Sequence, residues 1–454
     1  MVKSKEHSWH RRDGYPAFER CVKRKLFDMR LTGISRLKKC GRMVLMLTPL
    51  LVGGSRLSFG QTYCLRQILD KIDTANPGLQ QYALRTKASL LMGEASRAWA
   101  APEVGAGLSE FPYPAGGTDG DPMARKMLMI RLEQMFPNVR KQRTEQDYYR
   151  SFSSQHGDDR ATLQNMLFAE AKTAYYEAVI AQHQLAVLAG QEKQLKLLIG
   201  IAADRLTYNT ATTADIYKAR AKLGDLHGTR VQLQSACEQA FVKLNSLMGR
   251  SFDAPLQVDT SLNLPSRISI LEVDSAYVQQ HRSDIRHTLD GIHSMALKQR
   301  IEASAAAPTF GVMADNMRMD GGTYMYGVMA TVNIPIAPWS SKGYHAKTSA
   351  LRYQVQAMEK QKDNQVREAL EHVHKDWLAL RAATQDLGIF EREVLPAYRE
   401  TFQANLNALS ENTGNIYETL AAWNDLTEHE MEYYSKLGKL LKLRVMLETD
   451  MQSD

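Results

Sequence analysis

Two closely spaced histidines are the first residues to consider for chemistry, because a His pair can bind a metal ion. His372 and His374 are two residues apart in a helical pattern, about 200° around the helix axis, so their rings cannot chelate one ion together. The sequence contains no phosphate-binding loop, no G-x-S-x-G nucleophile motif and no H-E-x-x-H zinc motif. We therefore expect no enzyme activity, no cofactor and no metal site.

Methionines recur on two of the expected strands. Met127 and Met129 share one strand face, as do Met325 and Met329, and Met313 and Met317 lie nearby. Their thioethers could offer weak, transient sites to Cu(I) or Ag(I). Methionine also fills irregular space in protein interiors, and this simpler role is the one we expect.

The charge of this 454-residue chain is unevenly distributed. The first 60 residues hold 14 Lys and Arg against 4 Asp and Glu, and the other 394 hold 43 against 46. The body therefore has no positive excess that would attract nucleic acid, and we expect no nucleic-acid partner. The four cysteines form no disulfide framework and no Cys-x-x-Cys motif.

The leading segment resembles a secretory signal peptide. Basic residues precede an apolar run of about 12 residues, Met43–Gly54, and the small residues Ser58 and Gly60 would precede a cut before Gln61. The apolar run is too short to span a bilayer. Met1 and Met29 both remain possible starts. The alternatives are a basic cytosolic tail followed by a buried helix, or a lipid anchor on Cys64.

A proline-free stretch at about 138–208 predicts one helix roughly 105 Å long. Apolar residues recur there at steps of three and four from Leu167 to Leu206, with Glu192 out of place, and from Ile216 to Leu247 in the next helix, with Arg230 out of place. A seven-residue apolar repeat predicts helices that pack along a narrow seam. Cys237 holds a seam position, so we expect it to be a packed core residue.

The body after Gln61 repeats itself, which predicts a mainly α-helical fold with a small β part and an internal twofold repeat. Pro102 and Gly105 recur as Pro308 and Gly311, each 206 residues later. We expect a leading segment at 1–60, a first repeat at 61–265 and a second at 266–454. The first repeat should hold a helix, a β-hairpin at about 101–136, a long helix at about 138–208 and a helix at about 212–249. The second should hold a helix, a β-hairpin at about 308–335, a long helix at about 340–408 and a helix at about 413–448.

The expected strands are apolar on one face and small, polar or methionine-bearing on the other. This alternation is typical of a barrel that faces lipid outside and water inside, although a soluble sheet packed on one face is the ordinary alternative. Four strands cannot close a barrel, so three chains should supply twelve strands and continue as a helical tunnel. The lumen-lining candidates are Arg131, Glu133, Met325, Met329, Thr331 and Asn333.

From Gln61 to about Glu448 the chain resembles the TolC-like outer membrane efflux factor family. The resemblance rests on Asn76–Pro77, Phe136–Pro137, Ile334–Pro335 and two turns, Asn209–Tyr217 and Asn412–Tyr417. The segments Ile334–Lys342 and Arg282–Ile285 resemble the heavy-metal, CusC-like branch.

The resemblance implies a passive, homotrimeric exit duct in the outer membrane of a Gram-negative bacterium, with a large periplasmic portion, for metal ions or small toxic compounds. Its implied partners are outer-membrane lipid, a periplasmic adaptor protein and an inner-membrane pump, often of the resistance-nodulation-division type. Glu418 takes the place of a family acid at the narrowest point, while a second family acid falls on Ala421. The implied adaptor-docking tips are Asn209, Thr210, Thr213, Asp215, Asn412, Thr413, Gly414 and Asn415.

Three simpler interpretations remain. Glu418 could be an ordinary acid at a helix start, where the helix dipole favours negative charge. The whole chain could be a soluble coiled-coil scaffold without a pore, whose strands form only a dimerisation sheet. A lipid-anchored periplasmic adaptor is weaker, because adaptors lack two long-helix repeats with matched hairpins.

Overall fold

The computed structural model describes residues 62–109, 127–207, 212–262, 273–319 and 322–452. The chain divides into a unit at Met1–Leu57 and a unit at Ser58–Asp454, and the described residues all belong to the second. The signal-peptide and cleavage predictions at 1–60 lie outside the described residues.

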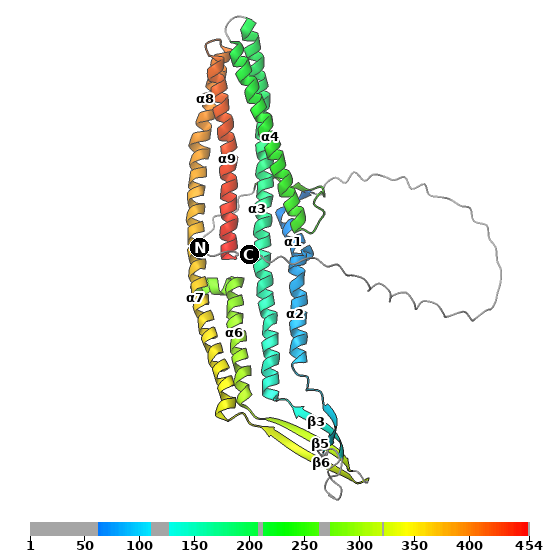
Figure 1. The fold of residues 1–454 in the computed structure, drawn as a ribbon. Coiled ribbons are helices and arrows are strands. Elements are labelled where there is room, and N and C mark those ends of the chain that lie inside the picture. Colours follow the sequence, from blue (N-terminus) through cyan, green and yellow to red (C-terminus); the bar gives the residue numbers. More distant parts are fainter. Residues whose placement is uncertain (1–61, 110–126, 208–211, 263–272, 320–321, 453–454) are drawn as a thin grey trace, which may run out of the picture. The chain divides into compact units, whose positions relative to one another are not determined.

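The helix α3 (Val139–Thr207) is the axis of the first half and extends for about 100 Å. Two shorter helices, α2 (Pro77–Ala95) and α4 (Thr213–Leu247), pack along different stretches of it, as Figure 1 shows. The predicted seam is confirmed, because seam residues such as Ala171 and Leu195 in α3 and Leu244 in α4 are fully buried. Cys237 is also buried in this core, and burial raises the pKa of its thiol.

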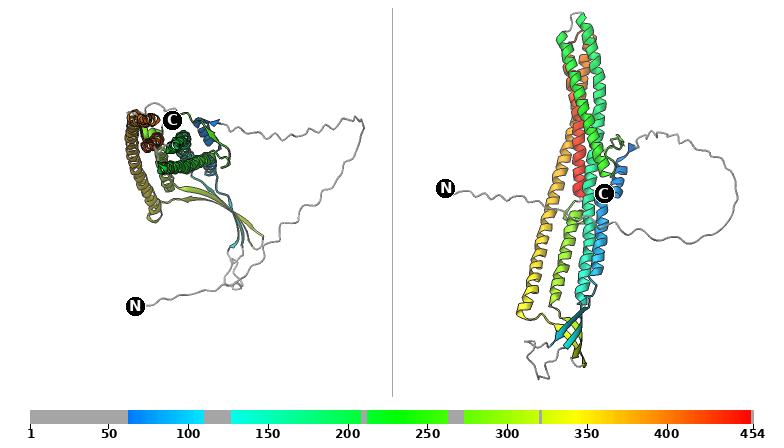
Figure 2. Two further views of the ribbon diagram at one scale, coloured as in Figure 1. Left: turned by 90° about the horizontal axis from the view of Figure 1, so that it is seen from above. Right: turned by 45° about the vertical axis from the view of Figure 1, so that its right-hand side comes forward.

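The second half contains the same kinds of element in the same order. The helix α6 (Ser283–Ala303) packs on α7 (Pro338–Ile389), while α9 (Ile416–Met451) packs on both α7 and α8 (Leu395–Ser410). The two halves meet where α3 contacts α6 and α9. Figure 2 shows these helices lying side by side.

The long helix predicted at about 340–408 is not a continuous α-helix. A π-helical turn at Phe390–Val394 separates α7 from α8. Pro396 causes this interruption, since proline has no N–H to donate and its ring clashes with the carbonyl four residues earlier. The helix also begins earlier than expected, with Pro338 at its first position, where a missing N–H has no consequence.

Two further short helices precede α2 and α6. The helix α1 (Leu65–Ala75) ends at Asn76 because a residue before proline avoids the helical conformation. The Asn76 side chain then caps α2, accepting a hydrogen bond of 2.8 Å from the Gly78 N–H. In the second half, α5 (Ser275–His281) is separated from α6 at Arg282, whose backbone is extended.

The four predicted strands lie where their alternation places them. They are β2 (Glu103–Ser109), β3 (Met127–Phe136), β5 (Thr309–Met319) and β6 (Tyr324–Asn333). They form one antiparallel sheet in the order β2-β3-β5-β6, so the two hairpins pair through β3 and β5. The outer edges of β2 and β6 pair with no other described strand.

The sheet extends from one end of the helices (Figure 1). The end of α3, the start of α4 and the turn that joins α8 to α9 lie at the opposite end (Figure 1). A second, parallel pair of strands, β1 (Thr62–Tyr63) with β4 (Gln257–Val258), was not predicted. Within the described ranges, no helix has both the length and the apolar character needed to cross a bilayer.

Candidate functional site

The two faces of the sheet differ in chemistry. The backbone register puts Ala106 of β2, Ile130 of β3 and Val328 of β6 on one face, and most of its other positions are also apolar. This face is open in the single chain, where Val328 is 80% exposed. An exposed apolar surface of this extent needs a partner or a lipid environment.

Aromatic side chains stand at both ends of this apolar face. Tyr324 and Tyr326 lie near the β5–β6 turn and are exposed. At the helical end, Trp99 packs edge-on against Phe136 with ring centroids 5.7 Å apart, and Trp339 at the start of α7 is 86% exposed. Sequence reasoning did not group these aromatic residues at the two ends of the strands, although their positions were visible in the sequence.

The opposite face brings together all six predicted lumen-lining candidates. The register places Arg131, Glu133, Met325, Met329, Thr331 and Asn333 on this side. Arg131 of β3 lies directly opposite Asp315 of β5. The Asp315 carboxylate occupies the space above Gly327 of β6. A Cβ added at Gly327 would lie 2.6 Å from Asp315 Oδ1, so any larger residue there would displace the Asp315 carboxylate.

The turn between α8 and α9 is held by its own backbone. The N–H groups of Thr413 and Gly414 both donate to the Ala408 carbonyl, at 3.0 and 2.8 Å. Asn412 has a positive φ of 62°, a conformation that asparagine tolerates better than most residues. Asn415 caps α9 by accepting a hydrogen bond of 2.9 Å from the Tyr417 N–H. These four residues are all tip candidates, and the structure gives each of them a role in the turn.

At the turn between α3 and α4, Asn209 and Thr210 lie outside the described residues. Thr213 is exposed at the first position of α4. Asp215 forms a capping box with Thr212, in which the Asp215 N–H donates to the Thr212 hydroxyl at 3.3 Å and the Thr212 N–H donates to Asp215 Oδ2 at 3.1 Å. The carboxylate of Asp215 therefore caps the N-terminus of α4.

Arg205 in the last turn of α3 joins the two tips, a contact that sequence reasoning missed. Its guanidinium donates to the Gly414 carbonyl at 3.1 Å, to Asn412 Oδ1 at 2.8 Å and also to the Leu409 carbonyl. A second contact between tips is made by Lys218, whose ammonium lies 4.6 Å from the centre of the Tyr417 ring. The end of α3 and the first turns of α4 are therefore connected to the α8–α9 turn and the start of α9.

Glu418 lies in the first turn of α9 at this same end. Its side chain is exposed, and the structure gives it no hydrogen bond or ion pair within the described part of the chain. The carboxylate is thus available to solvent or to another molecule. Ala422 and Trp423, about one turn further along α9, are buried in the helical core.

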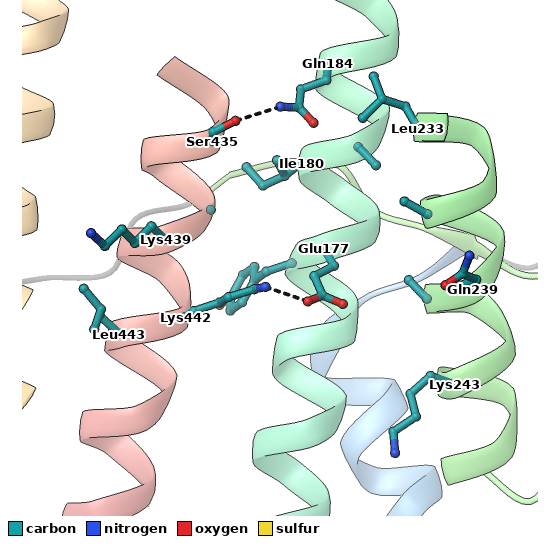
Figure 3. Close-up of a pocket in the computed structure, with 15 residues that line it drawn as sticks. Glu177, Ile180, Gln184, Leu233, Gln239, Lys243, Ser435, Lys439, Lys442 and Leu443 are labelled. Atoms are coloured by element: carbon teal, nitrogen blue, oxygen red, sulfur yellow. Dashed lines mark hydrogen bonds and ion pairs between the residues drawn. The ribbon is translucent and has the colours of Figure 1, made fainter. Parts of the chain in front are cut away.

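A cavity of about 730 Å³ lies between α3, α4 and α9, and Figure 3 shows its lining. Lys442 pairs with Glu177 across it at 2.7 Å, and Gln184 donates to the Ser435 hydroxyl at 3.2 Å. The lining includes no His, Cys or Asp, and its only carboxylate is the paired Glu177. The cavity thus lacks a free carboxylate or imidazole that could act as a general base. In the part of the chain that the structure describes, no three His, Cys, Asp or Glu residues gather as a metal site.

No protein-family model matches the sequence, and no curated protein matches it. Solved structures match it over most of its length. The outer-membrane channel OprN is 18% identical, with a TM-score of 0.70 over 86% of this chain and 90% of its own. CusC, described as forming a transmembrane channel, is 13% identical, with a TM-score of 0.70 over 87% and 93%. VceC, an outer membrane protein of Vibrio cholerae, is 13% identical, with a TM-score of 0.69 over 85% and 95%. This chain therefore has the fold of these outer-membrane proteins.

Proposed function

We propose that this chain is one protomer of an outer-membrane exit duct, a passive channel of a tripartite efflux system in a Gram-negative bacterium. The observation that carries this proposal is the sheet at the end of helices about 100 Å long. It has one exposed apolar face and two edges that pair with no other described strand. The fold shared with OprN, CusC and VceC supports it. The duct itself performs no covalent chemistry.

Three chains complete the channel in this proposal. The edges of β2 and β6 need partners, because an unpaired strand edge is unfavourable in a bilayer. Three copies supply twelve strands, an even number within the range of outer-membrane barrels. The shared order of elements in the two halves supports an internal repeat, with first and second units at 61–265 and 266–454. Together the helices of three chains form the periplasmic tunnel.

The sheet faces take opposite roles in the closed barrel. The apolar face with its terminal aromatic residues meets lipid, as in other membrane barrels that have aromatic girdles. The lumen is then lined by Arg131, Glu133, Met325, Met329, Thr331 and Asn333. A soluble scaffold without a pore is less well supported, because it would leave residues such as Val328 exposed to water.

The opposite end of the helices forms the gate and the docking surface. Glu418 is the proposed aperture acid, since its carboxylate is exposed and has no partner in the described part of the chain. The tips that would contact a periplasmic adaptor are Asn209, Thr210, Thr213, Asp215, Asn412, Thr413, Gly414 and Asn415. The adaptor connects the duct to an inner-membrane pump, of which the resistance-nodulation-division type is the expected class. Residues 1–60 would direct export as a signal peptide, and the cargo is metal ions or small toxic compounds.

Disulfide cross-linking in isolated outer membranes tests this proposal. Native cysteines are replaced by alanine, and one cysteine on β2, at Val104 or Leu108, is combined with one on β6, at Tyr326 or Val328. Oxidation should give dimers and trimers, because β2 and β6 are opposite edges of one sheet and can meet only between chains. The control pair Ala106 and Ile130, which oppose each other within one chain, should remain monomeric. Only monomers from every β2–β6 pair, or a protein found in the soluble fraction, would overturn the proposal.

A further inference from the structure

All methionines of the four-stranded sheet lie on the same face as Arg131, Glu133 and Asp315. The opposite face carries branched aliphatic and aromatic residues but no methionine. Filling space with apolar volume does not require such a separation of thioethers from aliphatic side chains. The methionines are Met127, Met129, Met135, Met313, Met317, Met319, Met325 and Met329.

Three of these methionines form one row across three strands. Met317 of β5 is directly opposite Met129 of β3 on one side and Met325 of β6 on the other. Directly opposed residues have Cβ atoms about 4.5–5.5 Å apart. Methionine side chains have three rotatable bonds, so the three sulfur atoms can converge on a single point. The backbone pairing thus supplies a three-thioether set.

A second row combines a carboxylate with two thioethers. Met313 of β5 is directly opposite Glu133 of β3 and Met329 of β6. Between the two rows lie Arg131 and Asp315, and Glu103 of β2 is directly opposite Glu133, so this part of the face holds three carboxylates and one guanidinium. This balance of charge favours a cation over an anion.

The β6 members of both rows are accessible, and the β3 and β5 members are half-buried. Met325 and Met329 are 39% and 57% exposed. On β2, the residue directly opposite Met129 is Gly107. A Cβ added at Gly107 would have no atom within 4 Å, so the space beside Met129 is open. The Met129 sulfur already accepts a hydrogen bond from Arg131 Nη2 at 3.6 Å. Its lone pairs are therefore presented on this face.

We infer that this face binds soft monovalent metal ions, Cu(I) or Ag(I), through the row Met129–Met317–Met325, with Glu133–Met313–Met329 as a second site. Uncharged thioethers are soft ligands that select such ions over hard cations. Sequence reasoning expected these methionines only to fill space, because it did not show which of them oppose one another. The inference rests on the proposed function, which turns this face toward a water-filled lumen.

Titration of the purified full chain in detergent with silver nitrate tests the inference by calorimetry. Cysteines are first replaced by alanine, as in the cross-linking test, since thiolates bind Ag⁺ more strongly than thioethers do. In the variant Met129→Leu/Met317→Leu/Met325→Leu, leucine keeps the side-chain volume but removes the sulfur. Affinity for Ag⁺ should fall by about tenfold or more at the first site. The control Met166→Leu/Met446→Leu changes two exposed methionines on α3 and α9 and should bind as the parent does.

Absence of Ag⁺ binding in the parent, or unchanged binding in the triple variant, would overturn the inference. Conductance of the same preparations in planar bilayers separates this outcome from the proposed function. If the protein conducts but shows no methionine-dependent binding, the metal site is refuted and the channel proposal stands. If it does not conduct but the triple variant loses Ag⁺ affinity, the metal site is supported and the channel proposal is refuted.

Discussion

Glu192 of α3 and Arg230 of α4, the two charged residues that interrupt the apolar seams, are ion-paired with each other. Lys196 also donates to the Glu192 carboxylate at 2.6 Å, and His227 lies 3.6 Å from it. Each residue looks like a defect in its own helix, yet together they form a polar link between neighbouring helices. The sequence marked both positions as exceptions to the apolar repeat but could not show that the two side chains pair with each other.

The first prediction concerns the pH dependence of this link. Hydrogen bonds from Lys196 and Arg230 lower the pKa of Glu192 to about 2, from an ordinary value of 4.5. An acid with a lowered pKa in the folded state stabilises the fold above its ordinary pKa, and this contribution is lost as pH falls from about 4.5 to 2. Glu192→Gln should therefore lower the melting temperature at neutral pH, and the difference from the parent should shrink in acid.

Thermal unfolding followed by circular dichroism across this pH range measures the effect. Asp225→Asn is the matched control, because Asp225 is 73% exposed and pairs with Lys222 at 3.9 Å, a contact of little energetic value. Equal pH profiles for the parent and Glu192→Gln would show that the ion pair does not contribute to stability.

Arg205 provides a second prediction, at the tips. Both Arg205→Ala and Arg205→Lys should speed backbone hydrogen exchange in the turn at 409–414. Alanine removes the guanidinium, and the single ammonium of lysine cannot donate to Leu409, Asn412 and Gly414 at once. Exchange measured by mass spectrometry should change there and not in the strands. Arg220→Ala, on an exposed position of α4, is the control. Protection of 409–414 that is the same in all variants would contradict the role assigned to Arg205.

Gly414 gives a steric prediction. A Cβ at this position would lie 2.8 Å from the Leu409 nitrogen and 2.9 Å from the Ala408 carbonyl carbon, and these backbone atoms cannot move without opening the turn. We expect Gly414→Ala to destabilise the α8–α9 hairpin by about 1–3 kcal/mol. The control Gly228→Ala, in an open part of α4, should be neutral or stabilising by up to about 1 kcal/mol. Chemical denaturation of both variants measures the difference, and equal midpoints would refute the steric argument.

Val328 and Met329 are neighbours on β6 that point to opposite faces of the sheet. If the apolar face meets lipid, Val328→Lys should destabilise the inserted barrel by about 2–4 kcal/mol, while Met329→Lys on the proposed lumen face should have a much smaller effect. Heat stability of the trimer on gels provides the measurement. In a water-soluble scaffold both lysines would face solvent, so equal tolerance of the two would favour that alternative.

Glu418 allows a test of the gate. Glu418→Ala should widen or destabilise the closed tip, because it removes an unpaired carboxylate from the proposed aperture. Conductance in planar bilayers should rise relative to the parent. Glu400→Ala, which removes an exposed acid from α8 away from the turns, should leave conductance unchanged. If Glu418→Ala also conducts like the parent, Glu418 is not part of the gate.

The sequence predicted the elements better than their contacts. The hairpins predicted at about 101–136 and 308–335 contain all four strands of the larger sheet, and the apolar repeat identified buried seam residues such as Ala171 and Leu244. Both patterns are local, because one face of a strand or helix must be buried. The break at Pro396 was missed because the surrounding apolar pattern continues through it.

Contacts between distant segments could not be read from local patterns. Arg205 and Asn412 are 207 residues apart, and nothing in either segment specifies the other. The strands β1 and β4 have two residues each, too few for any alternation to be recognised. The methionine rows depend on the pairing of β3 with β5, which joins the two hairpins and is absent from the sequence of either.

The bare edges of β2 and β6 set a condition on biogenesis. A newly made chain can assemble its helical cores alone, but its sheet remains a template for any extended strand it encounters, including a second copy in the wrong register. In the proposed trimer, completion of the sheet is a reaction between molecules, so its rate depends on concentration. Crowding of incomplete chains promotes aggregation by the same edges. Slow, dilute refolding in the presence of lipid or detergent should therefore recover more material than rapid refolding at high concentration.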